Sequence, residues 1–194
     1  SFLVTSAMPG EGKSTVSANI AISLAMKGYK VILVDADLRN PSTAKVLGMQ
    51  EQELGTLQVL KGEVKIEDAV QPYKDTSVMV LAGSSPIQDT STVLSGENMR
   101  QFIKELEAKA DFVVIDTPPS AMLSDAAIVA QYVDGAVFVI RQDYTEADRI
   151  LEGMEILSSS GAQITGCILN DANVKGNSSE HYKNSYRLKG EVKV

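Results

Sequence analysis

Ten consecutive residues near the start of the chain have the composition of a phosphate-binding loop: Ser6-Ala7-Met8-Pro9-Gly10-Glu11-Gly12-Lys13-Ser14-Thr15. Gly10 and Gly12 would let backbone N–H groups turn toward phosphate oxygens, and a helix N-terminus after them adds partial positive charge. Lys13 would reach the β- and γ-phosphates of ATP, and the Ser14 hydroxyl would take a Mg²⁺ coordination position. The pattern therefore predicts an ATP site that includes Met8, Pro9, Gly10, Glu11, Gly12, Lys13, Ser14 and Thr15, with Lys13 in a catalytic role.

Two other interpretations fit parts of this loop. Ala7 stands where the usual pattern has its first glycine, so a plain strand-to-helix turn with a surface lysine is one alternative. The other is a dinucleotide fingerprint, because an acidic strand end follows Gly10-Glu11-Gly12 about twenty residues later. The third glycine of that fingerprint would fall at Thr15, and Lys13 has no purpose in it. The phosphate-loop interpretation is therefore preferred.

Acidic residues follow two apolar runs that are typical of buried strands. Asp35 and Asp37 come at the end of the run that starts at Val31, and Asp116 ends the run that starts at Phe112. Because ligands bind at the carboxyl ends of strands in open α/β sheets, we expect these carboxylates beside Lys13, holding Mg²⁺ and serving as a base. The prediction assigns Asp35 and Asp37 to catalysis and Ser14, Asp35 and Asp116 to the metal. An aspartate that only caps the next helix is the alternative.

Short apolar runs alternate with segments of helical period, which predicts an α/β fold with a mainly parallel β-sheet between helices. Together with the phosphate-binding loop, this predicts a three-layer P-loop NTPase fold. The predicted strands, apolar enough to be buried on both faces, are Phe2 to Thr5, Val31 to Asp35, Val78 to Ala82, Phe112 to Asp116, Gly135 to Ile140 and Ile164 to Leu169. The predicted helices are Ser14 to Lys27 with Gly28 as C-cap, Asn98 to Ala110, Glu146 to Ser158, and two or three short ones within Pro41 to Gln71.

Composition narrows the class of protein. The chain has 194 residues, which suits one domain, and 25 acidic against 18 basic residues give a net charge of −7. There is thus no global electrostatic footprint for nucleic acid. The single cysteine, Cys167, is expected in the core, and it suggests a reducing, cytoplasmic compartment. No apolar run reaches the length of a membrane span. We expect an ATP-binding kinase domain at residues 1–172 and a flexible polar tail at 173–194.

Three strings in order resemble the bacterial tyrosine kinases of capsular and exopolysaccharide synthesis: the loop of Ser6 to Ser14, Val-Asp-Ala-Asp-Leu-Arg at Val34 to Arg39, and Val-Ile-Asp-Thr-Pro-Pro at Val114 to Pro119. The second is the most specific of the three. This resemblance implies an ATP- and Mg²⁺-dependent protein-tyrosine autokinase. It also implies that Asn170 lies where related folds touch adenine, although an Asn that caps a turn would look the same.

The resemblance further implies partners. It predicts a membrane adaptor whose cytoplasmic segment activates the kinase, protein-tyrosine substrates, a homo-oligomer of the full-length chain, and a location at the inner face of the membrane through the adaptor. Tyr182 and Tyr186 are the predicted autophosphorylation sites in the tail. The alternative function is a ParA/MinD-like ATPase that acts as a nucleotide-dependent switch. That group usually carries a second lysine five positions before the loop lysine, and Met8 stands at that position.

Overall fold

A central sheet of seven strands organises the part of the chain that the computed structural model describes, residues 1–50 and 52–173. The spatial order is β3-β4-β2-β5-β1-β6-β7, and every neighbouring pair is parallel except β3 with β4. The strands are β1 Phe2–Ser6, β2 Val31–Asp35, β3 Gln71–Pro72, β4 Val78–Leu81, β5 Phe112–Asp116, β6 Gly135–Arg141 and β7 Ile164–Asn170. The parallel arrangement brings the carboxyl ends of β1, β2 and β5 to one edge.

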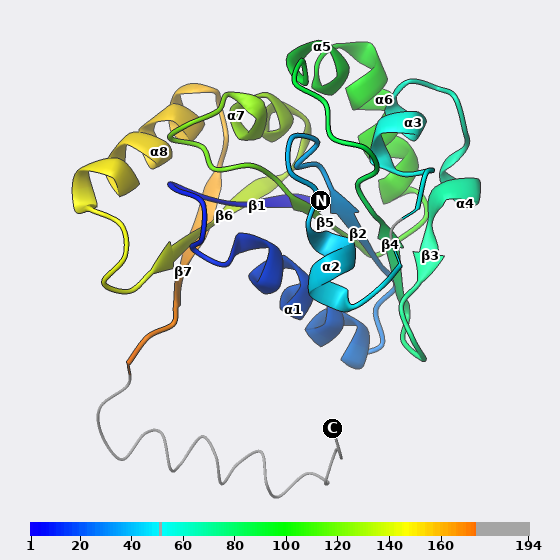
Figure 1. The fold of residues 1–194 in the computed structure, drawn as a ribbon, viewed down its shortest axis with the longest axis horizontal. Coiled ribbons are helices and arrows are strands. Elements are labelled where there is room, and N and C mark those ends of the chain that lie inside the picture. Colours follow the sequence, from blue (N-terminus) through cyan, green and yellow to red (C-terminus); the bar gives the residue numbers. More distant parts are fainter. Residues whose placement is uncertain (51, 174–194) are drawn as a thin grey trace, which may run out of the picture.

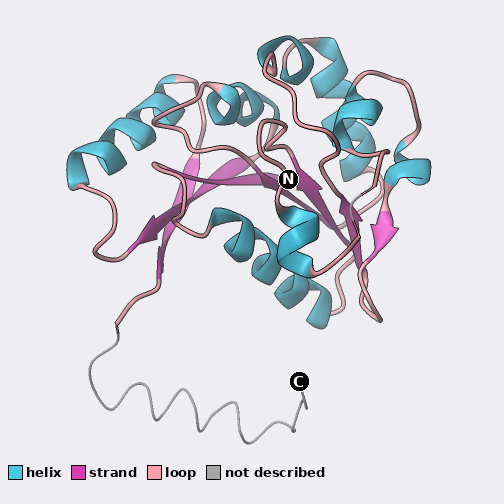
Figure 2. Cartoon of the chain, in the orientation of Figure 1, coloured by secondary structure: helices cyan, strands magenta, loops and turns pink. Residues whose placement is uncertain are grey.

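Helices cover both faces of this sheet and make the fold three-layered (Figures 1 and 2). Helices α1 and α2 lie on one face, and α3 to α8 lie on the other (Figure 1). The helices are α1 Lys13–Met26, α2 Thr43–Leu47, α3 Thr56–Leu60, α4 Ile66–Ala69, α5 Ser91–Leu94, α6 Glu97–Glu107, α7 Asp125–Val129 and α8 Ala147–Ser159, with a 3₁₀ turn at Ala130–Tyr132. The predicted α/β P-loop NTPase architecture is confirmed.

Two apolar cores, one on each side of the sheet, hold the layers together. Val16 and Ala21 of α1 pack with Leu33 of β2 in the first core, and Phe102 of α6 and Leu157 of α8 belong to the second. Small residues on α1 allow close approach to the sheet, and burial of apolar area stabilises the packing by roughly 25 cal/mol per Å². Helix α1 ends at Met26, one residue before its predicted end at Lys27. Gly28 follows with a left-handed φ of 91°, as predicted for a glycine that terminates a helix.

The strand at the β7 edge corrects one prediction. We expected Ile164 to Leu169 to be buried on both faces and Cys167 to lie in the core. Instead β7 is the last strand in the sheet, Cys167 is exposed, and Leu169 is 58% exposed. An apolar sequence is shared by central and edge strands, so periodicity alone could not separate the two.

Several short elements were not predicted. β3, α5 and α7 contain two, four and five residues, too few to show a period. The region between Pro41 and Gln71 contains three short helices, as expected. Among the described residues, no helix has the length and apolar character needed to cross a membrane. The predicted tail, apart from Asn173 itself, lies outside the described residues.

Candidate active site

The predicted phosphate loop connects β1 to α1, as its chemistry requires. Gly10 and Gly12 have φ values of 85° and 89°, a left-handed conformation that side chains disfavour. A Cβ atom at Gly12 would stand 2.2 Å from Asn170 Nδ2, and one at Gly10 would stand 2.5 Å from Tyr144 Oη. Both glycines are therefore required by backbone conformation and by close neighbours. Ala7 is completely buried, so the departure from the usual first glycine is accommodated in the core.

Lys13 begins helix α1 and faces one of the predicted carboxylates. Its Nζ atom lies 3.2 Å from Asp37 Oδ2, and the two side chains are only 13% and 6% exposed. Asp37 Oδ1 also accepts a hydrogen bond from the Asn40 N–H at 3.0 Å. A weakly solvated lysine paired with a carboxylate is ready to bind anionic oxygen atoms in place of that carboxylate.

Asp35 and Asp116 are register neighbours at the ends of β2 and β5, and both are completely buried. Asp35 Oδ2 accepts hydrogen bonds from the N–H groups of Ser42 and Thr43, each at 2.9 Å. It therefore caps the start of α2, as the alternative interpretation of the sequence allowed. Burial is the main cause that raises the pKa of Asp35, and the N–H of Thr43 opposes this.

Asp116 is the least satisfied of the three carboxylates. Its Oδ1 accepts a hydrogen bond from Ser17 Oγ at 3.3 Å, while its buried Oδ2 has no hydrogen-bond partner. Burial raises the pKa of Asp116 to about 7, the positive charge of Lys13 lowers it, and the negative charge of Asp35 raises it further. A buried carboxylate oxygen without a partner marks a place where a cation or a cation-bound water would be favourable.

The carboxylates do not form a metal cage by themselves. Within residues 1–50 and 52–173, no three His, Cys, Asp or Glu side chains are grouped so that they could hold a metal ion. The predicted metal ligands Ser14, Asp35 and Asp116 therefore stay a prediction. The residues still suit Mg²⁺, which commonly takes one or two carboxylates together with phosphate oxygens and waters. Asp116 Oδ2 and Ser14 Oγ, which accepts a hydrogen bond from Ser42 Oγ at 2.9 Å, are the oxygens that fit this pattern.

A cavity of about 370 Å³ opens over the loop. It is lined by most of the predicted site, namely Pro9, Gly10, Gly12, Lys13, Ser14, Thr15 and Asp37. Asp35 lines a neighbouring cavity of about 380 Å³ instead, on the side of Pro41 and Gly83. Tyr182 and Tyr186 lie outside the described residues. The structure thus brings together the loop, Lys13 and Asp37 around one space.

Two of the predicted ATP-binding residues, Glu11 and Asn170, do not line that space. The Glu11 side chain is completely buried; its Oε2 accepts from the Met8 N–H at 2.7 Å and its Oε1 from Thr145 Oγ1 at 2.9 Å. Only the backbone N–H of Glu11 is left to bind phosphate, and the N–H of Met8 is already used. Asn170 Nδ2 donates to the Glu11 carbonyl at 2.8 Å, so this residue supports the loop from outside.

Sequence reasoning missed several residues that support the site. Arg39 Nε donates to Asp125 Oδ2 at 2.8 Å, and Thr90 Oγ1 donates to Asp125 Oδ1 at 2.9 Å. The contact between Arg39 and Asp125 fixes the segment after β2 to the start of α7. Tyr144 Oη donates to the Pro9 carbonyl at 3.1 Å, and the Arg141 guanidinium stacks over the Tyr144 ring at 4.9 Å. Arg39 could have been found from the sequence, because it is the last residue of the Val34 to Arg39 motif. No sequence pattern points to Asp125 or Tyr144.

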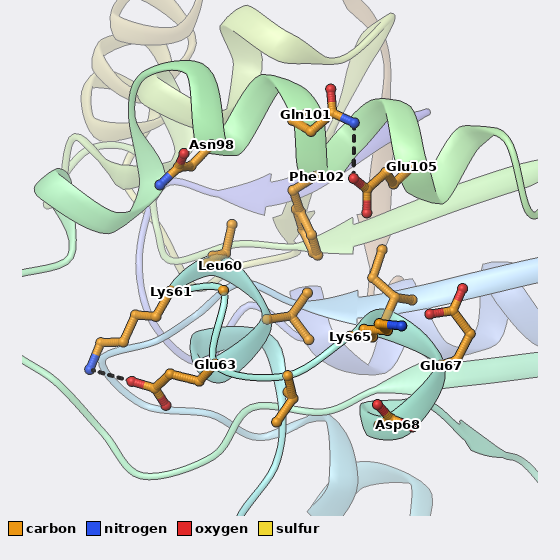
Figure 3. A pocket seen from close by; sticks show the side chains of 14 residues that line it. Leu60, Lys61, Glu63, Lys65, Glu67, Asp68, Asn98, Gln101, Phe102 and Glu105 are labelled. Atoms are coloured by element: carbon orange, nitrogen blue, oxygen red, sulfur yellow. Dashed lines mark hydrogen bonds and ion pairs between the residues drawn. The ribbon is translucent and has the colours of Figure 1, made fainter.

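A larger groove of about 930 Å³ lies elsewhere, between the α3–α4 segment and α6 (Figure 3). Leu60 and Phe102 are buried in it, and charged side chains such as Lys61, Glu63 and Glu105 stand around them (Figure 3). None of the predicted site residues lines this groove. Its size alone gives no reason to place the chemistry there.

Comparison with known proteins agrees with this geometry. A family model described as ParA, NUBPL iron-transfer P-loop NTPase, matches residues 1–194. The tyrosine-protein kinase YwqD of Bacillus subtilis is 35% identical over 182 residues, which are 94% of this chain and 76% of YwqD. The crystal structure of the VpsO kinase domain has a TM-score of 0.82 and 34% identity, and the match covers 89% of this chain and 84% of that one.

The fold, the loop and the matched model define a nucleotide-binding P-loop NTPase of the ParA type. Within that class the chain belongs to the bacterial protein-tyrosine kinases, which transfer a phosphoryl group to tyrosine. The septum site-determining protein MinD of Pyrococcus horikoshii, solved with Mg-ADP, has a TM-score of 0.75 and 28% identity over 89% of this chain and 70% of that one. The switch-ATPase alternative is therefore the more distant relationship.

Proposed function

We propose that this chain is an ATP- and Mg²⁺-dependent tyrosine autokinase whose transfer centre is the cavity between Lys13 and Asp37. The observation that carries the proposal is the nearly buried Lys13–Asp37 pair, 3.2 Å apart over the glycine loop. Lys13 and the loop N–H groups bind the β- and γ-phosphate oxygens of ATP. Because the transition state of phosphoryl transfer spreads negative charge over these oxygens, their main task is to neutralise charge.

Asp37 is the base in this proposal. A tyrosine hydroxyl has an ordinary pKa near 10 and gains from a carboxylate that accepts its proton. Asp35 is less suited, because its Oδ2 already accepts two N–H groups from the start of α2. Asp37 lines the cavity together with Lys13, and its Oδ2 lies 3.2 Å from the Nζ atom of that lysine. On these grounds we propose Asp37, rather than Asp35, as the base.

Mg²⁺ would be held by Ser14 Oγ and, through water, by Asp116. Its chemical contribution there is to offset negative charge on the β- and γ-phosphate oxygens. The unpartnered Oδ2 of Asp116 supports this assignment. Asp35, proposed from sequence as a further ligand, lies beside Asp116 in register and contributes negative charge to the site. MinD of Pyrococcus horikoshii was solved with Mg-ADP, which is in keeping with the proposal.

The acceptors are Tyr182 and Tyr186, modified by a second copy of the chain. Residues 174–194 carry five Lys or Arg against two Glu, while the whole chain has a net charge of −7, so this segment is attracted to the acidic remainder of another copy. Each phosphate would bring about −1.5 to −2 charge to the segment. Modification therefore weakens the attraction and favours release.

Labelling with γ-labelled ATP and Mg²⁺ tests the function directly. A Lys13→Met chain that keeps its tyrosines is mixed with an active chain carrying Tyr182→Phe and Tyr186→Phe. We expect label on tyrosine of the Lys13→Met chain. Label that appears only as free phosphate would favour the switch ATPase, and phosphotyrosine only outside residues 174–194 would refute the assignment of the acceptors.

The cellular role follows from the family resemblance and is also proposed. The kinase would act in the cytoplasm at the inner face of the membrane, as a homo-oligomer activated by the cytoplasmic segment of a membrane adaptor, and would regulate capsular or exopolysaccharide synthesis. The adaptor segment should raise the rate of transfer by the purified chain. Equal rates with and without that segment would contradict the activation.

A further inference from the structure

The cavity over the phosphate loop is lined by polar and by apolar side chains. Lys13, Ser14 and Asp37 account for phosphate, metal and base. The apolar lining consists of Val46, Pro118, Pro119, Met122 and Leu123, and the polar residues Arg39, Asn40 and Ser42 also line the cavity. Val46 belongs to α2, which lies on one face of the sheet, and the other apolar residues follow β5 on the way to α7, which lies on the other face (Figure 1).

Two side chains of this apolar lining are exposed to solvent. Met122 is 57% exposed and Val46 is 41% exposed. Phosphates and Mg²⁺ need polar partners and leave such side chains uncovered. The predicted adenine contact does not explain them either, because Asn170 supports the loop from the side of Glu11 and does not line this cavity. Apolar surface beside a built polar site commonly marks the binding place of an apolar ligand group.

We propose that Met122, together with Leu123 next to it in the chain, forms an acceptor shelf that holds the aromatic ring of the tyrosine to be phosphorylated. A tyrosine side chain combines an apolar ring with a polar hydroxyl, and this cavity is lined by apolar side chains as well as by Lys13 and Asp37. The thioether of a methionine contacts aromatic rings favourably and adapts its shape to them. A flexible shelf that recognises only the ring would accept tyrosines in different sequence contexts. This inference rests on the transfer centre proposed above.

The shelf gives the transfer step a defined direction. A ring on Met122 would let its hydroxyl oxygen reach toward Asp37 and the γ-phosphate. The tyrosine oxygen forms a bond to the γ-phosphorus while the bond from that phosphorus to the β–γ bridging oxygen breaks. The proton of the hydroxyl goes to the Asp37 carboxylate, and ADP leaves with the electron pair. Met122 itself takes no part in this bond exchange and acts by positioning.

Peptide binding tests the shelf without requiring turnover. The probe is a fluorescent peptide with the sequence of residues 184–188, which contains Tyr186, measured with a non-hydrolysable ATP analogue and Mg²⁺ present. Met122→Ser should weaken binding by roughly three- to tenfold, and the conservative Met122→Leu should restore most of it. Replacing the tyrosine of the peptide by phenylalanine should preserve the effect, and replacing it by alanine should abolish the effect.

A matched control separates the shelf from general surface effects. Met26, at the end of α1, is 82% exposed and does not line the cavity, so Met26→Ser should change neither peptide nor nucleotide binding. In turnover assays Met122→Ser should raise the KM for the peptide more than it lowers kcat. Unchanged peptide affinity would overturn the shelf, and so would an equal loss of ATP affinity, because the apolar lining would then hold adenine. Failure of the wild-type chain to label tyrosine while it still binds the peptide through Met122 would instead overturn the proposed function.

Discussion

Two lysine–carboxylate pairs lie in two cavities of this molecule, and they differ in burial. Lys13 and Asp37 are 3.2 Å apart and 13% and 6% exposed, whereas Lys61 and Glu63 are 3.9 Å apart and 45% and 53% exposed. The second pair lies in the groove between the α3–α4 segment and α6, whose volume is about 930 Å³ against about 370 Å³ for the cavity over the loop. An exposed ion pair contributes roughly 0–1 kcal/mol, while buried charges depend strongly on their partners. The burial of an ion pair, rather than the volume of the cavity, therefore identifies the candidate active site.

The largest effect is expected when the buried lysine is removed. Lys13→Met should reduce tyrosine phosphorylation at least about 100-fold and weaken ATP binding, because the γ-phosphate loses its direct cationic partner. The matched Lys61→Met should leave both within about twofold, in line with the small contribution of exposed pairs. Initial rates and nucleotide titrations give the two numbers, with circular dichroism to verify folding. Similar losses in both variants would erase the distinction between the two cavities.

The next largest effect concerns the carboxylate partner. Asp37→Asn should lower kcat by roughly 10²–10⁴-fold with a modest change in ATP affinity, since a general base acts as the proton is transferred. Glu63→Gln serves as the control in the groove, and its kcat should not change. The measurement is steady-state phosphorylation of a tyrosine peptide at saturating Mg²⁺. A normal kcat in Asp37→Asn would return the role of base to Asp35.

A third prediction concerns the free energy of unfolding. Glu11→Ala should lower the free energy of unfolding by about 1–3 kcal/mol, because the part-buried N–H of Met8 and hydroxyl of Thr145 lose their acceptor. The exposed Glu105 borders the groove, and Glu105→Ala should change the free energy of unfolding by less than about 0.5 kcal/mol. Urea denaturation of both variants without nucleotide measures the difference. A small loss for Glu11→Ala would mean that water replaces the carboxylate.

The smallest predicted effect has the opposite sign. Asp116→Asn should raise the Tm of the nucleotide-free protein by about 2 °C or more at pH 8, since about 1 kcal/mol corresponds to about 2–4 °C in a domain of this size. The folded-state pKa of Asp116 is raised from 3.8 to about 7, so ionisation of this carboxyl disfavours folding as pH rises through that window. The gain should therefore vanish near pH 4.

Thermal unfolding at both pH values tests this, with Glu105→Gln as an exposed control that should show no gain. A variant less stable than the wild type at pH 8 would indicate that ionised Asp116 is already well compensated by Lys13. Activity should nevertheless fall in Asp116→Asn, because the same unpartnered oxygen is proposed to serve the metal. A gain in stability with a loss of activity would resemble the trade-off seen at other functional sites.

Sequence reasoning found the parts of the site that depend on local pattern. The glycine loop, Lys13 and the acidic strand ends follow from a strand, a turn and a helix in succession, and the structure has them in place. The Arg39–Asp125 contact joins residues 86 positions apart, and no local spacing announces it. The inward turn of Glu11 was also hidden, because a loop pattern specifies residue types but not which way a side chain points.

The fold, too, was predicted well where local pattern decides and poorly where contacts between distant residues decide. Strands β2 and β5 match their predicted bounds, since continuous apolar runs mark buried strands well. Cys167 was misplaced because the order of strands in a sheet is a tertiary property. Short elements such as α5 and α7 depend on the contacts around them, among them the packing of Leu94 and Val129 in one core. Such elements contain too few residues for a periodic signal.

The buried Glu11 bears on how this loop could be exchanged between relatives. Its carboxylate connects the loop to Thr145, and Arg141 donates a further hydrogen bond from its side chain to the Gly10 carbonyl at 3.3 Å. The ten-residue motif is therefore not a self-contained module, because its geometry is completed by a segment about 130 residues later in the chain. A graft of the loop alone into another P-loop protein should fold poorly unless the segment between β6 and α8 is transferred together with it. Chimeras made with and without that segment would measure how much the loop depends on residues outside the ten-residue motif.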